Sequence, residues 1–98
     1  MILEVAEITV KIGDEAAFER GVERATPHFL RAKGCHGVAL HRVVENSSVY
    51  RLLVTWETVD NHMVGFRNSD GFQEWRRLVS PYFNGPPSVT HSQPVAKY

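Results

Sequence analysis

The sequence predicts an α+β protein in which a four-stranded antiparallel sheet carries its helices on one face. Segments with an apolar residue at every second position alternate with segments of helical period, in the order strand, helix, strand, strand, helices, strand. The two middle strands are joined by a short, turn-forming segment. With 98 residues, 43% of them hydrophobic, the chain is expected to be a single domain over residues 1–98.

The first strand is predicted over residues 2–12, where apolar side chains recur at every second position. Glu4 interrupts this apolar row. Glu7 belongs to the opposite face, so the two carboxylates are not expected to form a pair. The apolar positions are Ile2, Ala6, Ile8, Val10 and Ile12.

The first helix is predicted from Asp14, a capping residue after Gly13, to about Lys33. Its apolar stripe falls on one face of the helix. Pro27 is expected to kink the helix or to split off its last turn, and Gly34 is a C-terminal stop signal. The stripe consists of Phe18, Val22, Ala25 and Phe29.

Two further strands are predicted over residues 37–44 and 49–57. Residues 45–48 between them favour a hairpin turn, so the two strands are expected to pair antiparallel.

Helices and a last strand complete the chain. Thr58 can cap a short helix that ends near Phe66. Asp70 and Gln73 have capping-box spacing for a longer helix up to about Val79, and Ser80-Pro81 ends it. After the rigid turn Gly85-Pro86-Pro87, residues 88–95 have room for the last strand.

This order of elements predicts a ferredoxin-like βαββαβ protomer, which leaves one face of the sheet without helices. The run Arg51-Leu52-Leu53-Val54 is apolar on both sides of its strand. A second copy of the chain is the simplest cover for such a face, so we expect a homodimer formed through the sheet.

Charge and composition exclude several classes of partner. Eleven Lys and Arg balance eleven Asp and Glu, so binding to nucleic acid or to an anionic membrane is not expected. No stretch approaches the roughly 18 apolar residues of a membrane span, and no signal peptide is apparent. The single Cys35 suits a reducing compartment, and the protein is expected to be soluble and cytoplasmic.

No metal site is expected. Cys35, His36 and His41 lie close together in the sequence, but the two histidines are an odd number of residues apart on a strand and point to opposite faces. His28 and His91 carry no signal that assigns them a role.

The candidates for a functional role are individual residues and not a complete sequence motif. Trp56 closes the third strand, and His62 and Phe66 lie one helical turn apart on the following helix. Trp56 is either a stacking wall for a flat substrate or a core residue, and His62 is either a proton acceptor or a packed side chain. Of Arg76 and Arg77, one must face the Trp75 side of the last helix, where it would hold an anion or act only as a surface cation.

Several longer segments of the chain resemble those of a known protein family. They are Trp56-Glu57-Thr58, His62, Phe66 to Ser69, Phe72 to Arg76, Ser80 to Phe83 and Pro86 to His91, preceded by Gly34 to Gly37 and Tyr50 to Val54. Together they resemble the antibiotic biosynthesis monooxygenase domain family over nearly the whole chain. The resemblance implies a dimeric α+β barrel with a cavity between the sheet and the helices of each protomer. Some members oxidise anthrones or hydroquinones with oxygen and without a cofactor, and others degrade haem.

Four positions connect the chain to the quinone-forming branch. Trp56 and Arg76 match the branch's pocket residues. His62 stands where the branch has a polar aromatic residue, and Leu52 replaces an Asn, which removes a donor for the substrate. The haem-degrading branch fits worse, because its iron-binding His falls near Trp75-Arg76, so haem is not the expected ligand.

We therefore expect an oxidoreductase, a cofactor-independent monooxygenase that uses oxygen as co-substrate on an electron-rich aromatic such as a hydroquinone or anthrone. His62 would be the base and Arg76 the anion clamp, and Trp56 would act with them. The substrate-binding residues would be Phe66, Trp75, Phe83 and Leu52. The alternatives are a non-catalytic dimer that binds or senses a hydrophobic metabolite, and a haem-degrading monooxygenase, which the missing axial His disfavours.

Overall fold

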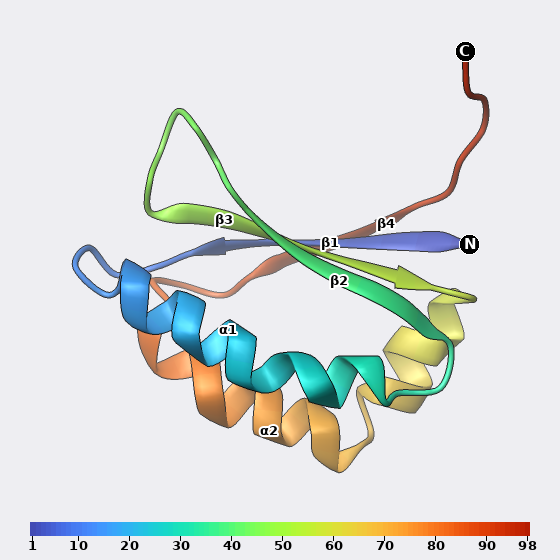
Figure 1. Cartoon of the computed structure of the whole chain (residues 1–98), viewed down its shortest axis with the longest axis horizontal. Helices are drawn as coiled ribbons and strands as arrows, with labels where there is room; N and C mark the ends of the chain where they lie inside the picture. Colours follow the sequence, from blue (N-terminus) through green and yellow to red (C-terminus); the bar gives the residue numbers. More distant parts are fainter.

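A computed structural model describes residues 1–98 and confirms the predicted α+β architecture. The elements are β1 (Ile2–Thr9), α1 (Glu15–Leu30), β2 (Cys35–Arg42), β3 (Val49–Trp56), the π-helix η1 (Asn61–Phe66), α2 (Asp70–Val79), the short 3₁₀ helix η2 (Ser80–Tyr82) and β4 (Ser88–Ser92). The sheet has the order β2-β3-β1-β4 with every neighbouring pair antiparallel. Both α-helices lie on the same face of this sheet, as a ferredoxin-like fold requires (Figure 1).

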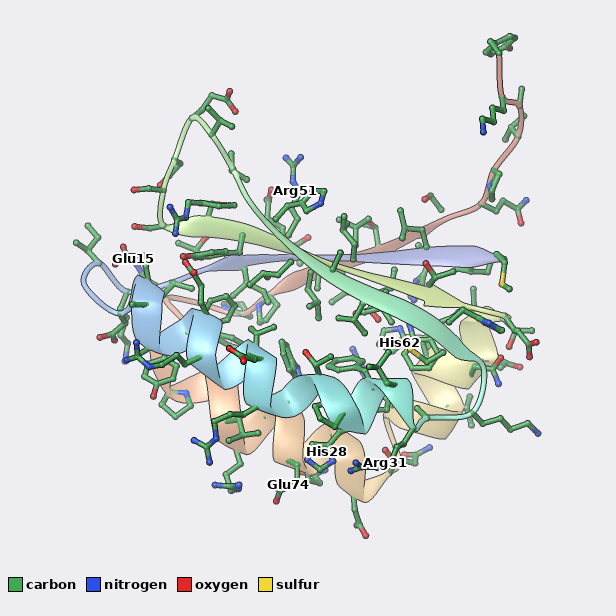
Figure 2. The ribbon with its side chains drawn as sticks, viewed as in Figure 1. Glu15, His28, Arg31, Arg51, His62 and Glu74 are labelled. Atoms are coloured by element: carbon green, nitrogen blue, oxygen red, sulfur yellow. The ribbon has the colours of Figure 1, made fainter.

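The core lies between the sheet and the helices, where side chains fill the space (Figure 2). The stripe predicted for the first helix is buried in full, and it meets apolar side chains from β1, β3 and α2. Gly21 is buried where α1 crosses α2. Only glycine fits there, because a Cβ at this position would lie 2.6 Å from the carbonyl oxygen of Leu78. The two helices therefore approach each other more closely than any larger residue would permit.

Some element ends differ from the predictions. β1 stops at Thr9, and Ile12 is 92% exposed, because the chain leaves the sheet for a turn at Gly13 with φ +97°. α1 runs through Pro27 and ends at Leu30, three residues before the predicted end. Pro27 is tolerated there because it removes only one helical N–H bond, close to the end of the helix.

The start of α2 was predicted one residue too late. The N-cap is Ser69, whose hydroxyl accepts a 3.3 Å hydrogen bond from the backbone N–H of Phe72. Asp70 is already helical, and the extended backbone of Ser69 is what a capping residue adopts. Thr58 caps the preceding helical segment as predicted, since its hydroxyl accepts a 3.1 Å bond from the N–H of Asn61.

The strands also differ in length. β2 begins at Cys35, two residues earlier than predicted. Its register with β3 shifts between Cys35 and Gly37. β4 ends at Ser92 and not at Val95, because its pairing with β1 stops at Leu3. The chain beyond β4 extends away from the body of the molecule (Figure 1).

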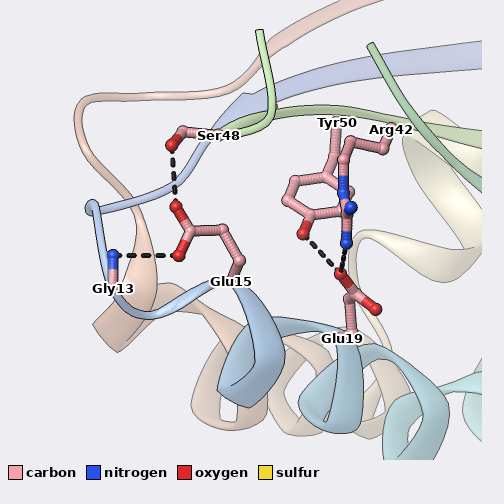
Figure 3. Close-up of polar contacts among 6 residues, drawn as sticks. All are labelled: Gly13, Glu15, Glu19, Arg42, Ser48 and Tyr50. Atoms are coloured by element: carbon pink, nitrogen blue, oxygen red, sulfur yellow. Dashed lines mark hydrogen bonds and ion pairs between the residues drawn. The ribbon is translucent and has the colours of Figure 1, made fainter. Parts of the chain in front are cut away.

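Two carboxylates tie the start of α1 to the β2–β3 hairpin (Figure 3). Glu19 Oε2 accepts a 2.5 Å hydrogen bond from the hydroxyl of Tyr50 and a 2.6 Å bond from the guanidinium of Arg42. Glu15 accepts a 2.7 Å bond from the hydroxyl of Ser48. These bonds hold the pKa of both carboxyls below the usual range. They fix the hairpin over the first half of the helix.

No helix covers the opposite face of the sheet (Figure 1). Val5 and Leu53 lie side by side in the register there, with Thr90 and Ala39 beside them. The predicted homodimer through this face stays a prediction. Neither α-helix combines the length and apolar character needed to cross a bilayer.

Candidate functional site

A cavity of about 500 Å³ lies between the helix-bearing face of the sheet and α2, a volume typical of small-molecule sites. Seven of its fourteen lining residues are hydrophobic, so it suits a largely apolar ligand that carries polar groups. The lining residues are Glu4, Ala6, Ile8, Leu52, His62, Arg67, Phe72, Trp75, Arg76, Ser80, Phe83, Pro86, Pro87 and Val89.

Five of the seven sequence-predicted site residues line this cavity: Leu52, His62, Trp75, Arg76 and Phe83. The other two, Trp56 and Phe66, do not. The indole of Trp56 is fully buried and lies parallel to the ring of His62, with 5.4 Å between ring centroids. Phe66 stacks on Phe29 of α1 at 4.5 Å. Both therefore support the lining residues of this cavity from behind, and Phe66 instead lines the larger groove described below.

Glu4 is the residue that the sequence reasoning passed over. It lies on the inward face of β1 and is only 4% exposed. Its Oε1 accepts a 2.9 Å hydrogen bond from the indole N–H of Trp56. Its Oε2 has no hydrogen bond within the chain. Because no fully buried side-chain polar atom lacks a partner, this oxygen is not fully buried, and Glu4 lines the cavity.

His62 lies beside this carboxyl and shares its enclosure. Nε2 of His62 is 3.4 Å from Oε1 of Glu4. Figure 2 places His62 at the η1 end of the molecule, beneath the sheet. The side chain is held there because η1 follows β3 directly and packs its buried residues, His62 and Phe66, against Trp56.

Burial moves the pKa values of the two groups in opposite directions. It raises the pKa of Glu4 to about 7, against the Trp56 hydrogen bond and the charge of Arg67, which both lower it. It lowers the pKa of His62 to about 4, and the charges of His91 and Arg67 act in the same direction. At neutral pH the imidazole is uncharged and the carboxyl is close to half-protonated. The site thus holds an exchangeable proton.

His91 extends the pair. It faces Glu4 across the β1–β4 ladder, and its Nε2 lies 2.8 Å from Nδ1 of His62. His91 is only partly buried. The sequence did contain a signal for Glu4 and His91. Glu4 interrupts an apolar row on an inward face, and His91 is two residues from Val89 and so lies on the same face of β4 as this cavity-lining residue.

The two consecutive arginines of α2 point in different directions. Arg76 lines the cavity. Arg77 lies on the exposed side of the helix, where its Nη2 is 2.7 Å from Oε2 of Glu74. A further cation, Arg67, also lines the cavity and lies over the ring of Phe72 at 5.7 Å. The apolar cavity therefore has positive charge at its α2 side.

A second hollow is larger but has a different character. It is a groove of about 680 Å³ between the end of α1 and the η1–α2 segment, and three of its thirteen lining residues are hydrophobic. His28, Arg31 and Glu74 lie there, at the outer side of the helices (Figure 2). Its charges are of both signs and exposed, whereas the smaller cavity holds buried titratable groups. We take the smaller cavity as the candidate site.

The fold and cavity define a small α+β protein with a cavity of mixed apolar and polar lining between sheet and helices. The model of the family described as antibiotic biosynthesis monooxygenase matches residues 1–78, and the chain belongs to this family.

Relatives span nearly the whole chain. The crystal structure of a Bordetella bronchiseptica protein that carries the family's name is 59% identical, with a TM-score of 0.95 and 97% of each chain covered. YczJ of Bacillus subtilis, an uncharacterised protein, is 37% identical over 95 residues, which cover 97% of this chain and all of YczJ. SnoaB, a cofactor-independent oxygenase from Streptomyces nogalater, is 19% identical with a TM-score of 0.82, over 98% of this chain and 94% of SnoaB, and shows the fold alone.

Proposed function

We propose that the protein is a cofactor-independent monooxygenase that oxidises an electron-rich aromatic molecule, of hydroquinone or anthrone type, in the 500 Å³ cavity. The observation that carries this proposal is the buried Glu4–His62 pair, which holds an exchangeable proton near neutral pH in the same cavity as Arg76. Membership of the family described as antibiotic biosynthesis monooxygenase supports the class of chemistry.

The chemistry needs a substrate anion, because a deprotonated phenol or enolate can give one electron to oxygen without a metal. In an anthrone the ring CH₂ becomes C=O, and the second oxygen atom leaves as water. The protein must accept a proton, hold the anion and exclude water. The Glu4–His62 pair would accept the proton. The guanidinium of Arg76 would stabilise the anion and lower the pKa of the substrate.

The walls of the cavity suit a flat ring system. Leu52 from β3, Trp75 from α2 and Phe83 from the following segment present apolar surface to it. They would keep water from the anion until oxygen arrives. Trp56 would act indirectly, by holding Oε1 of Glu4 in place.

A homodimer through the uncovered sheet face is part of the proposal. Val5 and Leu53 lie at the centre of that face, on the two middle strands. An apolar patch of this kind is typical of an interface between subunits. A second sheet placed there would complete an α+β barrel and leave the two cavities on the outer, helix-bearing sides.

The second candidate function is non-catalytic binding of a hydrophobic metabolite in the same cavity. Leu52 favours it, because a leucine on the cavity wall offers no hydrogen bond to a substrate hydroxyl.

The test is oxygen consumption by the purified protein with a panel of anthrones and hydroquinones, set beside the thermal shift that each compound induces. We expect uptake of one O₂ per anthrone together with a raised melting temperature. A thermal shift without oxygen uptake would support the binding function. A Soret band on titration with haemin would favour haem as the ligand.

A further inference from the structure

We propose that Glu4 takes the proton from the substrate, and that His62 and His91 form a relay that carries a proton between Glu4 and the surface. The substrate in this scheme rests on the proposed function. The relay itself is a property of three side chains and is tested without a substrate.

The first argument is that each nitrogen of His62 already faces another titratable side chain. Its Nε2 lies 3.4 Å from Oε1 of Glu4, and its Nδ1 lies 2.8 Å from Nε2 of His91. An imidazole has only these two sites for a proton. A substrate in the cavity would therefore compete with Glu4 and His91 for the nitrogens of His62, whereas Oε2 of Glu4 has no partner within the chain.

The second argument is that the three groups form a chain of contacts from buried side chains to a partly exposed one. Glu4 is on β1, His62 on η1 and His91 on β4, and the β1–β4 register sets Glu4 opposite His91. From Glu4, which is 4% exposed, the chain leads through His62, which is 3% exposed, to the partly exposed His91. It is a route from the cavity to the surface.

A proton moves along this route by four linked transfers. The substrate hydroxyl gives its proton to Oε2 of Glu4 as the proton on Oε1 passes to Nε2 of His62. The proton on Nδ1 of His62 passes to Nε2 of His91, and the proton on Nδ1 of His91 passes to water. The cavity gains one negative charge, on the substrate, and all three relay groups end neutral. The reverse transfers return a proton to the oxygen that leaves as water and reset the chain.

The electrostatics suit this role. A pKa of about 7 lets Glu4 exchange a proton near neutral pH, and a pKa of about 4 keeps His62 neutral, so that it donates at one nitrogen and accepts at the other. The other groups that face Glu4 are Arg67, after η1, and Arg76, on α2, which line the same cavity. Cys35 on β2 is also near Glu4. Burial is the main cause of the raised pKa of the Cys35 thiol, and the charge of Glu4 raises it further.

The substrate-free test is ¹⁵N NMR of the histidine side chains as a function of pH. We expect His62 to remain neutral from about pH 5 to 9 and to change its tautomer as Glu4 titrates near pH 7. The tautomer change should disappear in Glu4→Gln, an isosteric variant. A His62 that titrates as an ordinary imidazolium, or a tautomer that ignores pH in the wild type, would overturn the relay.

The kinetic test uses oxygen uptake with a substrate from the panel. Glu4→Gln should lower the rate by about 10²–10⁴-fold, the usual effect of removing a general base. His91→Gln should lower it less and reduce the solvent deuterium isotope effect. The matched control is His36→Gln, an exposed histidine outside the relay, and it should leave the rate and the isotope effect unchanged.

The outcomes separate the two proposals. If Glu4→Gln keeps full activity while His62→Gln loses it, His62 is the base and the relay is wrong. If no compound is oxidised, the proposed function fails, while the NMR titration still decides whether the three groups share protons. A melting curve of each variant shows that it is folded before its rate is compared.

Discussion

Oε1 of Glu4 lies 3.4 Å from Nε2 of His62, between side chains that are 5% and 4% exposed. At this distance a carboxylate and an imidazolium would form an ion pair in a more open site. Burial acts against both charged forms, so between about pH 4 and 7 both side chains are mainly neutral. A neutral pair can move a proton without the cost of separating two buried charges.

The opposed pKa values predict a specific pH dependence of stability. The pKa of Glu4 rises from 4.5 to about 7, so its contribution to stability is lost as the pH rises through 7. The pKa of His62 falls from 6.5 to about 4, so its contribution is lost as the pH falls through 4. Between about pH 4.5 and 6.5 the two slopes have opposite sign, and the pair should contribute little net slope in the wild type.

Replacing one residue of the pair should reveal the pH dependence of stability that the other residue contributes. In Glu4→Gln the free energy of unfolding should rise with pH between about 4 and 6.5, and in His62→Gln it should fall between about 4.5 and 7. Each change should be about 3 kcal/mol. Urea unfolding at a series of pH values measures both. Parallel curves for the two variants would contradict the shifted pKa values.

Trp56→Phe should cost more stability than Trp75→Phe. Both replacements remove the same atoms from a buried ring, but only the indole of Trp56 donates a hydrogen bond within the chain, to Glu4. The excess cost should be about 1–3 kcal/mol, and the pKa of Glu4 should rise further. Equal losses in urea unfolding would show that this hydrogen bond contributes nothing.

Arg76→Gln should weaken the binding of an anionic aromatic ligand by about 10–100-fold, the usual contribution of a charged hydrogen-bond partner. Arg77→Gln is the matched control, because Arg77 pairs with Glu74 outside the cavity. Calorimetric titration with a hydroxylated anthraquinone measures both. Equal affinities in the two variants would remove Arg76 from the site.

Gly21→Ala should destabilise the protein by about 1–3 kcal/mol, because the new Cβ would lie 2.6 Å from a backbone oxygen, that of Leu78, and would push α1 from α2. Gly65→Ala is the control: its nearest neighbour would be 3.8 Å away, and added helix propensity should make it neutral or slightly stabilising. Thermal unfolding compares the two. A neutral Gly21→Ala would mean that the helix crossing is looser than described.

Leu53→Glu should turn the proposed dimer into a monomer, because it puts a charge at the centre of the uncovered sheet face. Glu23→Lys, on the exposed side of α1, should leave the dimer intact. Light scattering after size-exclusion chromatography gives the mass of each. A wild-type protein that elutes as a monomer at all concentrations would contradict the dimer.

Periodicity predicted the fold well because it determines which face of each element is buried. The buried stripe from Phe18 to Phe29 and the alternation of buried and outward residues along β1 follow directly from the spacing of apolar residues. The ends of elements were harder: Ser69 and Asp70 are both good capping residues, and only the backbone angles decide between them.

The residues that line the candidate cavity were predicted in part. Family resemblance and helical spacing pointed to His62 and Arg76, which share the cavity. Glu4 was missed because an acidic residue in an apolar row looks like an interruption until its partner is known, and that partner, Trp56, is 52 residues away. His91 was missed for the same reason. Contacts between distant segments are what local patterns do not contain.

The central position of β1 has a consequence for how the protein is made. β1 leaves the ribosome before the other three strands of this sheet, yet one of its two neighbours, β4, is the last of the four to leave. Until then Glu4 has no histidine opposite it, and one edge of β1 stays open to other strands. Closure of the sheet and assembly of the proton chain are therefore the same late event in folding, and pairings between such distant segments are slow to form.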